Sequence, residues 1–173
     1  MQSPDRGFLA GLVALARARV EFILVGVGGI NFYAADASRA VETQDLDVLL
    51  APRVEVLHSA LAALAGAGFV FQAGGEPFLD VADEAALGSV LARGATIQAR
   101  DETGAQLDLM TSGLALRFED LARDAVSFRI GDVDVRVGRL EKLLRAKELA
   151  GRPKDLEFLR LYAARLREQT EGS

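Results

Sequence analysis

The chain has 173 residues, of which 50% are hydrophobic and 26% charged, and its formal net charge is −5. A chain of this length and composition buries about two-thirds of its unfolded surface, so we expect one globular domain that needs no metal or disulfide to fold. It has no cysteine and a single histidine, His58, which excludes a disulfide scaffold, a thiolate zinc site, a cysteine nucleophile and any site that needs two imidazoles.

The N-terminal stretch predicts an amphipathic helix that begins at 3–5, with Phe8, Leu12 and Leu15 at helical spacing. The apolar run 8–16 is nine residues long, whereas a helix needs about 20 residues to cross a bilayer. Charged residues before this run resemble a signal peptide only weakly. We therefore favour the helix and expect a cytoplasmic protein without membrane contact.

The next part of the chain predicts two strands, each followed by a helix. Val20–Val25 is a β-branched and aliphatic run that ends in glycine, as is typical of a buried strand. Leu46 and the run 48–50 predict a second strand, which carries Asp45 and Asp47. Between and after these strands we expect a glycine turn at 26–29, a short helix at 30–35, a polar loop at 36–43, and a helix from Pro52 to Gly66 or Gly68.

The second half of the chain predicts hairpins and further helices. Two glycines and a proline indicate a loop with short strands at 69–81. Two strand pairs are expected, each joined by a tight turn that contains glycine. The expected strands are 95–100, 105–110, 126–130 and 133–137, and the expected helices are 83–93, 118–124, 140–150 and 153–169.

Three aspartates lie on predicted strands. Asp45 and Asp47 are two residues apart, so both side chains point to the same face, and Asp108 alternates with two inward leucines. Aspartate is disfavoured in strands, and three on one face repel one another unless a positive charge lies between them. Carboxylates suit Mg²⁺, and two such ions assist phosphoryl or nucleotidyl transfer. The alternative is that these are edge or loop aspartates that face water.

The glycine turn at 26–29 bears on that choice. Glycine lets the backbone approach a ligand, and the start of a following helix offers free N–H groups to an anion. The turn lacks the Gly-Lys-Ser/Thr end of a P-loop and the third glycine of a dinucleotide fingerprint, because Asn31 holds that position. Taken alone, the turn fits either tight packing or a phosphate cradle, in which backbone N–H groups contact a phosphate. The Asp-x-Asp sequence that follows favours a phosphate cradle beside a metal site.

This order of elements resembles the nucleotidyltransferase superfamily, in which a Gly-Gly or Gly-Ser turn, an Asp-x-Asp and a third aspartate follow one another. Its counterparts here are Gly28-Gly29, Asp45-Leu46-Asp47 and Asp108. The chain is most similar to small stand-alone bacterial members, including abortive-infection toxins, which add an arginine, a threonine, a helix lysine and an Arg-Pro-Lys-Asp-like sequence. The matching residues are Arg39, Thr43, Lys147 and Arg152-Pro153-Lys154-Asp155.

The resemblance touches residues 20–50, 104–110 and 132–166, and it is specific as a set although each piece is weak. The chain departs from many relatives at Asn31 and at 35–36, where those relatives have an alanine and a histidine-glycine pair. The fold implied is α/β, with a mixed twisted sheet of about five strands, helices mainly on one face and a C-terminal helical pair. We expect the core at 1–138 and the helical extension at 139–173, in one compact unit.

The activity implied is transfer of a nucleoside monophosphate from an NTP such as ATP to an acceptor, with release of pyrophosphate. Asp45 and Asp47 would hold two Mg²⁺ ions, with Mn²⁺ as an alternative, and Asp108 would complete one site and help take the acceptor proton. Gly28 and Gly29 would contact the β- and γ-phosphates. The nucleotide-binding residues implied are Gly28, Gly29, Arg39, Thr43, Lys147 and Lys154.

Several of these residues keep a second interpretation. Arg39 contacts phosphate or belongs to a surface loop, and Thr43 ties the loop to the backbone more readily than it touches substrate. Asp155 either caps the last helix or orients Lys147. We expect His58 to face solvent.

Charge is unevenly distributed. Residues 139–167 include nine basic and four acidic side chains, so this segment carries +5 and the remainder −10. One explanation of this basic excess is a solvated helix face. Basic groups also steer phosphates, which motivates an RNA acceptor such as tRNA. We expect transfer to RNA or protein, as in the toxin of a toxin–antitoxin pair with a cognate antitoxin. The alternatives are an aminoglycoside-type small-molecule transferase and a non-catalytic nucleotide-binding regulator.

Overall fold

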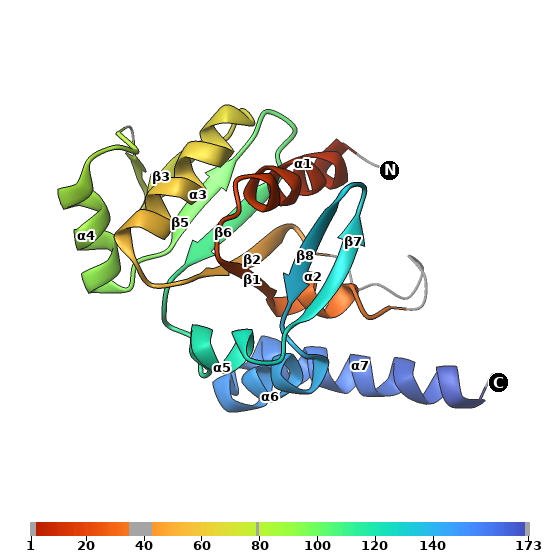
Figure 1. Cartoon of the computed structure of the whole chain (residues 1–173). Coiled ribbons are helices and arrows are strands. Elements are labelled where there is room, and N and C mark those ends of the chain that lie inside the picture. Colours follow the sequence, from red (N-terminus) through yellow and green to blue (C-terminus); the bar gives the residue numbers. More distant parts are fainter. Residues whose placement is uncertain (1–2, 35–42, 79, 172–173) are drawn as a thin grey trace.

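The computed structural model describes residues 3–34, 43–78 and 80–171. In these ranges the chain forms one mixed sheet of eight strands and seven helices (Figure 1). The strands are β1 Phe22–Val25, β2 Asp45–Leu50, β3 Val70–Ala73, β4 Glu76–Phe78, β5 Ile97–Arg100, β6 Gln106–Met110, β7 Val126–Ile130 and β8 Val133–Val137. The helices are α1 Ser3–Arg17, α2 Gly26–Asn31, α3 Val54–Gly66, α4 Glu84–Arg93, α5 Phe118–Ala122, α6 Leu140–Ala150 and α7 Pro153–Glu171.

The sheet order is β4-β3-β5-β6-β2-β1-β8-β7. The central strand β2 pairs antiparallel with β1 and parallel with β6. In this register Asp47 is opposite Asp108 on one side and Val25 on the other. Residues opposite one another in neighbouring strands point to the same face of a sheet. The pairing therefore places the acidic side chains of β2 and β6 on a common surface.

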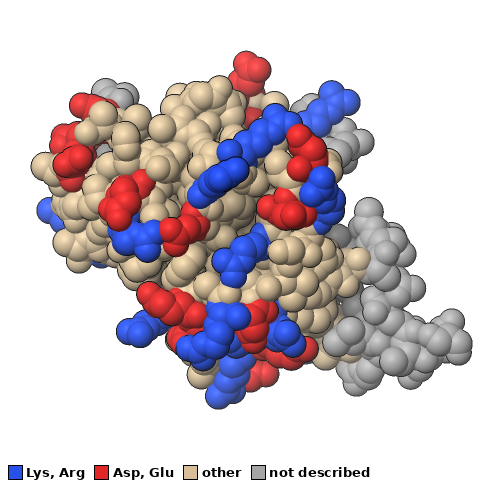
Figure 2. Space-filling model, viewed as in Figure 1, with Lys and Arg blue, Asp and Glu red and all other residues tan. Residues whose placement is uncertain are grey.

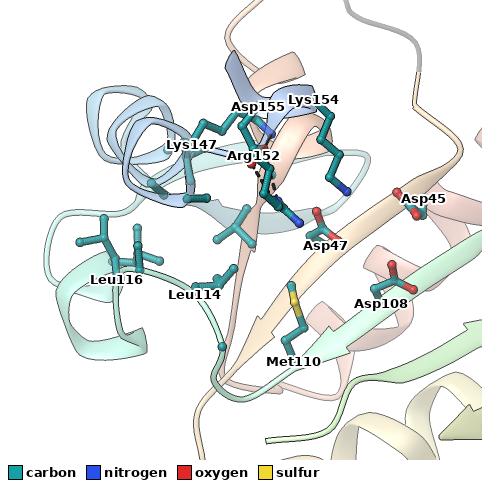
Figure 3. A pocket seen from close by; sticks show the side chains of 18 residues that line it. Asp45, Asp47, Asp108, Met110, Leu114, Leu116, Lys147, Arg152, Lys154 and Asp155 are labelled. Carbon is teal, nitrogen blue, oxygen red and sulfur yellow. Dashed lines mark hydrogen bonds and ion pairs between the residues drawn. The ribbon is translucent and has the colours of Figure 1, made fainter. Parts of the chain in front are cut away.

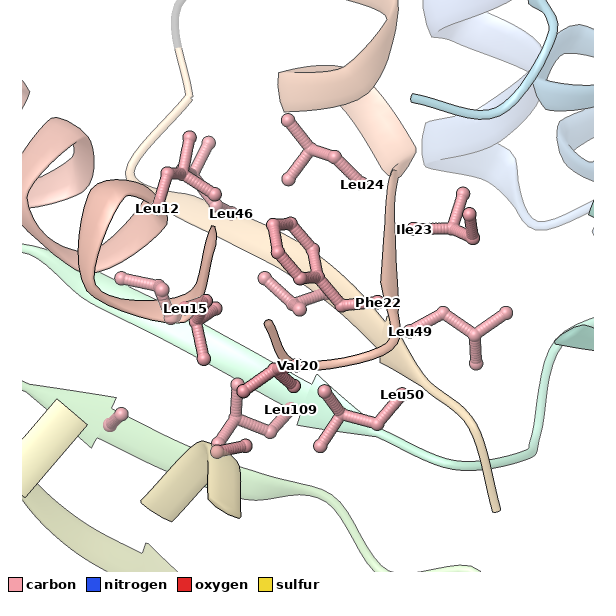
Figure 4. Packing of buried hydrophobic residues seen from close by; sticks show 14 of the residues in the cluster. Leu12, Leu15, Val20, Phe22, Ile23, Leu24, Leu46, Leu49, Leu50 and Leu109 are labelled. Carbon is pink, nitrogen blue, oxygen red and sulfur yellow. The ribbon is translucent and has the colours of Figure 1, made fainter. Parts of the chain in front are cut away.

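The opposite face of the sheet holds the main hydrophobic core. Leu12 and Leu15 of α1 are fully buried against strand residues such as Leu46 and Leu109 (Figure 4). Helices α1, α3 and α4 lie together on this side of the sheet (Figure 1). Each such leucine contributes about 1.5–3 kcal/mol when it leaves water. The alternation of β2 thus directs its leucines into the core and its aspartates out of it.

The prediction of about five strands is wrong, because the sheet has eight. The stretch 69–81, expected to be a loop with short strands, forms the hairpin β3–β4. Its two-residue connection, Gly74-Gly75, has positive φ at both residues, 62° and 81°, which is the geometry that suits a tight hairpin. Pro77 argued against regular structure, but it lies in an edge strand, where a missing N–H is tolerated.

The glycine turn also differs from its prediction. Helix α2 begins at Gly26, directly after β1, rather than at Ile30. Gly26 alone makes the change of direction, with a φ of +66° that favours glycine. A Cβ on Gly28 would lie 2.4 Å from Leu46 Cδ2, and one on Gly29 would lie 3.0 Å from the Leu24 carbonyl oxygen. These two glycines therefore let α2 pack closely on β1 and β2.

The C-terminal helices α6 and α7 pack on each other, and α6 also contacts α2. Leu143 of α6 is buried near Gly29, and the Tyr33 hydroxyl of the segment after α2 donates a hydrogen bond to the Gly138 carbonyl at 2.8 Å. The helical pair thus lies beside the end of β1, next to the acidic surface of β2. Across the described ranges, no helix combines the length and the apolar character that a membrane crossing requires.

Candidate functional site

The expected grouping of the three aspartates is confirmed. Asp45 and Asp47 of β2 and Asp108 of β6 each offer a carboxylate oxygen, and these atoms all lie within 4.8 Å of one another. All three side chains are partly buried. The arrangement follows from two ordinary features, alternation along β2 and the parallel register of β2 with β6.

Burial and neighbouring charges change the ionisation of Asp47 and Asp108. Burial raises the pKa of Asp47 to about 6 from its ordinary 3.8, and the charges of Asp45 and Asp108 add to the rise. Burial also raises the pKa of Asp108, while a hydrogen bond from the Gln106 amide, 2.7 Å from Asp108 Oδ1, acts in the opposite direction. Ionisation of the whole cluster therefore costs free energy, and a bound cation would lower that cost.

The donor set fits a metal ion. Three carboxylates on two paired strands provide only oxygen ligands, which hard divalent cations prefer. Neither cysteine nor histidine takes part, so soft metals have no ligand of their preferred kind here. The three aspartates could thus hold a metal ion.

The aspartates line a cavity of about 500 Å³ (Figure 3). This volume is within the usual range for a small-molecule site. Three cationic side chains, Lys147 of α6 and Arg152 and Lys154 around the start of α7, face the same cavity. Figure 3 shows Arg152 and Lys154 beside Asp47, so the site brings positive and negative groups together around one space, as a polyanion bound through cations would require. The remaining lining is mostly apolar and comes from Val25, Gly26, Met110, Gly113, Leu114, Ala115, Leu116, Leu121, Leu143, Ala146 and Ala150.

Asp155 holds two of these cations in place. Its side chain is 1% exposed, and its carboxylate lies 2.6 Å from Arg152 Nε and 3.4 Å from Lys147 Nζ. Burial would raise the pKa of Asp155, but Arg152 and Lys147 more than offset this, so the pKa is lowered. The Lys147 ammonium also lies 4.8 Å from the centre of the Phe158 ring. Of the two interpretations of Asp155, these contacts favour the one in which it orients Lys147.

The predicted glycine contacts are less direct. Gly26 lines the cavity, whereas Gly28 and Gly29 are buried against Leu46 and the backbone of Leu24 and are absent from its lining. Close helix packing, one of the two interpretations of this turn, thus explains both glycines. Their contact with phosphate stays a prediction.

Thr43 and His58 are not among the residues that line the cavity. The Thr43 hydroxyl donates to the Asp45 carbonyl at 2.8 Å, so it ties the incoming chain to the start of β2. Arg39 lies outside the described residues. His58 is exposed on α3, as expected, and α3 covers the face of the sheet away from the aspartates.

Two parts of the site escaped sequence reasoning. Arg152 was recognised only as part of the Arg-Pro-Lys-Asp sequence, although its guanidinium lines the cavity. Its spacing of three residues from Asp155, one turn of helix, was the available signal. The aliphatic residues at 113–116 carry no chemical signature, so nothing in the sequence marks them as lining.

Several basic side chains in the described part of the C-terminal segment have acidic partners. Lys142 and Arg139 pair with Asp124, Arg145 pairs with Glu148, and Arg160 pairs with Glu157. Figure 2 shows the blue and red side chains intermixed over the lower helices on that face. The cations that face the cavity are thus more distinctive than the net charge of the segment.

Comparison of the chain with protein-family models and with curated proteins finds no match. Interpretation of the site therefore depends on its residues and their geometry.

Proposed function

We propose that the protein is a metal-dependent nucleotidyltransferase, which moves a nucleoside monophosphate from an NTP to an acceptor hydroxyl. One observation carries the proposal: three carboxylates within 4.8 Å of one another share a cavity with three cationic side chains. Acidic side chains that hold divalent ions, combined with cations for phosphate oxygens, are what phosphoryl transfer requires, because its transition state is stabilised mainly by charge and position. The resemblance of Asp45-Leu46-Asp47 and Asp108 to the superfamily pattern supports the same proposal.

In this proposal Asp45 and Asp47 hold Mg²⁺, or Mn²⁺ in its place, and Asp108 completes the ligand set. Bound divalent ions would offset the charge on the reacting oxygens and orient the triphosphate. A second ion would let the carboxylates serve both the attacking and the leaving oxygen. The chain's own contribution is the rigid spacing of the three carboxylates on paired strands.

The chemical step conserves atoms and charge in a simple way. The acceptor hydroxyl oxygen forms a bond to the α-phosphorus, and the bond from that phosphorus to the α–β bridging oxygen breaks. The electron pair leaves with pyrophosphate. Asp108 is the carboxylate proposed to accept the hydroxyl proton.

The cations are assigned to the triphosphate. Lys147 and Arg152 are held by Asp155 and face the cavity together with Lys154. Their positive charge complements the β- and γ-phosphates and the departing pyrophosphate. Arg152 was absent from the nucleotide-binding residues expected from sequence and is added to them here.

The acceptor in this proposal is RNA, in keeping with the +5 charge of residues 139–167. The resemblance to abortive-infection toxins extends the proposal to a toxin–antitoxin system. Transfer to a protein or to an aminoglycoside would be detected in the same assay as a labelled product of a different kind.

The test uses each NTP labelled on the α-phosphate, incubated with the protein, Mg²⁺ or Mn²⁺, and total tRNA or cell lysate. We expect label to enter a macromolecule, and label placed on the γ-phosphate to appear only in pyrophosphate. Asp47→Asn should lose transfer, and Asp134→Asn, a change at an exposed carboxylate on β8, should retain it. Absence of transfer from all four nucleotides would reject the proposal. A cellular effect that survives Asp47→Asn would instead indicate a non-catalytic regulator.

A further inference from the structure

The cavity has two ends of different chemistry. Its polar side chains are the three aspartates and the cluster of Lys147, Arg152, Lys154 and Asp155. Figure 3 shows Leu114 and Leu116 on the side of the cavity away from Asp45 and Asp108. The site thus divides into a charged end and an aliphatic end, defined by residues 113–116 together with Met110, Leu121, Leu143, Ala146 and Ala150.

Four parts of the chain build the aliphatic end: β6, the segment 113–116, α5 and α6. Met110 closes β6, the segment 113–116 follows it, and Ala146 and Ala150 lie one turn apart on α6. Leu121 and Leu143 form its floor and are 1% and 3% exposed. Leu114 and Ala146 are only half-buried, so part of their apolar surface faces the cavity rather than the core. Such surface favours a flat, weakly polar ligand group.

The chemistry of the two ends matches the two ends of a nucleotide. A triphosphate is the highly charged end and a base is the flat end, whose faces are apolar although its edges are polar. No lining side chain of the aliphatic end, among the described residues, carries a nitrogen or oxygen atom that could read a base edge. Side-chain recognition of a particular base needs such atoms, because discrimination between similar ligands is large only where polar groups would be left unpaired.

We propose that the aliphatic end holds the nucleobase of the donor and accepts all four bases with similar affinity. This inference rests on the proposed function, since it assumes that the charged end binds the triphosphate. It goes further by assigning the base to the space beside Leu114 and Ala146 and by making the donor specificity broad. Base binding then depends on contact area rather than on hydrogen bonds from side chains.

The test compares ATP, GTP, CTP and UTP with ribose 5′-triphosphate, which has no base. Dissociation constants are measured by calorimetry with Ca²⁺ as the divalent ion. We expect the four nucleotides to bind within about fivefold of one another and each at least about tenfold more tightly than ribose 5′-triphosphate, as the apolar contact predicts.

Two substitutions at the aliphatic end locate the base. Ala146→Leu fills the space and should weaken binding of all four nucleotides by at least about tenfold, while the affinity for ribose 5′-triphosphate changes by no more than about twofold. Leu114→Ala removes contact area without filling the space, and it should weaken nucleotide binding severalfold. The matched control is Ala163→Leu, the same change at an exposed position of α7 outside the cavity lining, which should alter none of the five affinities.

The outcomes separate this inference from the function on which it rests. If ribose 5′-triphosphate binds as tightly as the nucleotides, or one base is preferred by more than about twentyfold, the base assignment is wrong while the donor site stands. The assignment is also wrong if Ala146→Leu and Leu114→Ala leave all four nucleotides unaffected. Failure of all five triphosphates to bind would reject the donor site and the inference with it.

Discussion

Asp47 has a strongly altered ionisation, and this has a consequence for stability. Its pKa is about 6 in the folded protein and 3.8 is its ordinary value, so between these values the folded state holds the proton more tightly than the unfolded state. Stability from this group is therefore complete below pH 3.8 and is lost as the pH rises through 6. Without a metal ion, the ionised Asp47 opposes folding at neutral pH.

Asp47→Asn should consequently stabilise the metal-free protein at pH 8, by up to about 3 kcal/mol, and should have little effect at pH 4. The measurement is urea unfolding in EDTA at both pH values. Glu102→Gln, an exposed change in the β5–β6 turn, is the control and should show no such difference. Equal stability of wild type and Asp47→Asn at pH 8 would show that the carboxylates do not repel one another as described.

Gln106 links the metal cluster to a residue outside it. Its carbonyl oxygen accepts from Arg100 Nε at 2.7 Å, and its amide nitrogen donates to Asp108 Oδ1 at 2.7 Å. Because arginine can only donate, it fixes the orientation of the amide and leaves the NH₂ group toward Asp108. Gln106 thus acts as a positioning residue for one carboxylate ligand.

Gln106→Leu should lower the affinity for Mn²⁺ by about tenfold while the thermal midpoint of the metal-free protein changes little. Mn²⁺ binding is measured by electron paramagnetic resonance, independently of any activity. Gln98→Leu is the matched control, because Gln98 is opposite Asp108 in β5 and lies on the same face. A similar loss in both variants would mean that polarity of the sheet surface, rather than the Gln106 hydrogen bond, sets the affinity.

At the scale of elements, Asp155 joins α6 to α7. Its buried carboxylate binds Lys147 of α6 and Arg152, just before α7. Asp155→Asn should cost about 2–4 kcal/mol, because it leaves the largely buried Lys147 without its counter-charge. The lowered pKa of Asp155 means that its contribution is present above the ordinary aspartate pKa and is lost as the pH falls. In acid, the free energy of unfolding of Asp155→Asn should thus approach that of the wild type.

Urea unfolding at pH 7 and at about pH 2, well below the ordinary aspartate pKa of 3.8, measures this difference. The comparison is Asp134→Asn, which breaks an ion pair with Arg129 whose side chains are 63% and 60% exposed; exposed pairs contribute little, so a change below about 0.5 kcal/mol is expected. Similar losses for both variants would contradict the structural role given to burial of Asp155.

How far the sequence predicts these elements depends on which interactions decide them. Alternation along 45–50 is a local property, so the common face of Asp45 and Asp47 was predictable. Their closeness to Asp108 was implied only by the resemblance, and it depends on the parallel pairing of β2 with β6, which no local pattern indicates. Short strands were expected at 69–81, but their pairing as the hairpin β3–β4 was not, because Pro77 opposes strand structure locally and is tolerated at the sheet edge.

The aliphatic end of the cavity could not be predicted for a related reason. Leu114 and Ala146 are separated in the chain by α5 and the β7–β8 hairpin and meet only through tertiary packing. Leucine and alanine are also common in any helix or core, so their residue types carry no signal. Charged residues with fixed spacing, such as Arg152 and Asp155, are readable from sequence, but apolar linings are not.

For the whole molecule, the site lies between two parts of the chain. Strands β2 and β6 supply the aspartates, and α6 and the start of α7 supply the cations. A ligand that bridges them stabilises both by mass action, by about 2.7 kcal/mol at a hundred times its dissociation constant. Ligand binding should therefore reduce the opening of the helical pair as well as of the central strands.

ATP with Ca²⁺ should slow amide hydrogen exchange in β2, β6, α6 and the first turns of α7, and leave the β3–β4 hairpin unchanged. Hydrogen exchange with mass spectrometry measures this, with Asp47→Asn as the variant in which protection is lost from both parts together. Protection confined to the strands would show that the helical pair takes no part in binding.

The margin of the sheet at β4 has a consequence for solubility. An outer strand with free backbone groups is a template on which other chains can add, and natural proteins shorten or interrupt such strands. Strand β4 spans three residues, and Pro77 at its centre has no N–H to offer. Pro77, which opposes strand structure locally, thus protects this edge of the sheet against the addition of a strand from another molecule. No other element is needed to cover β4.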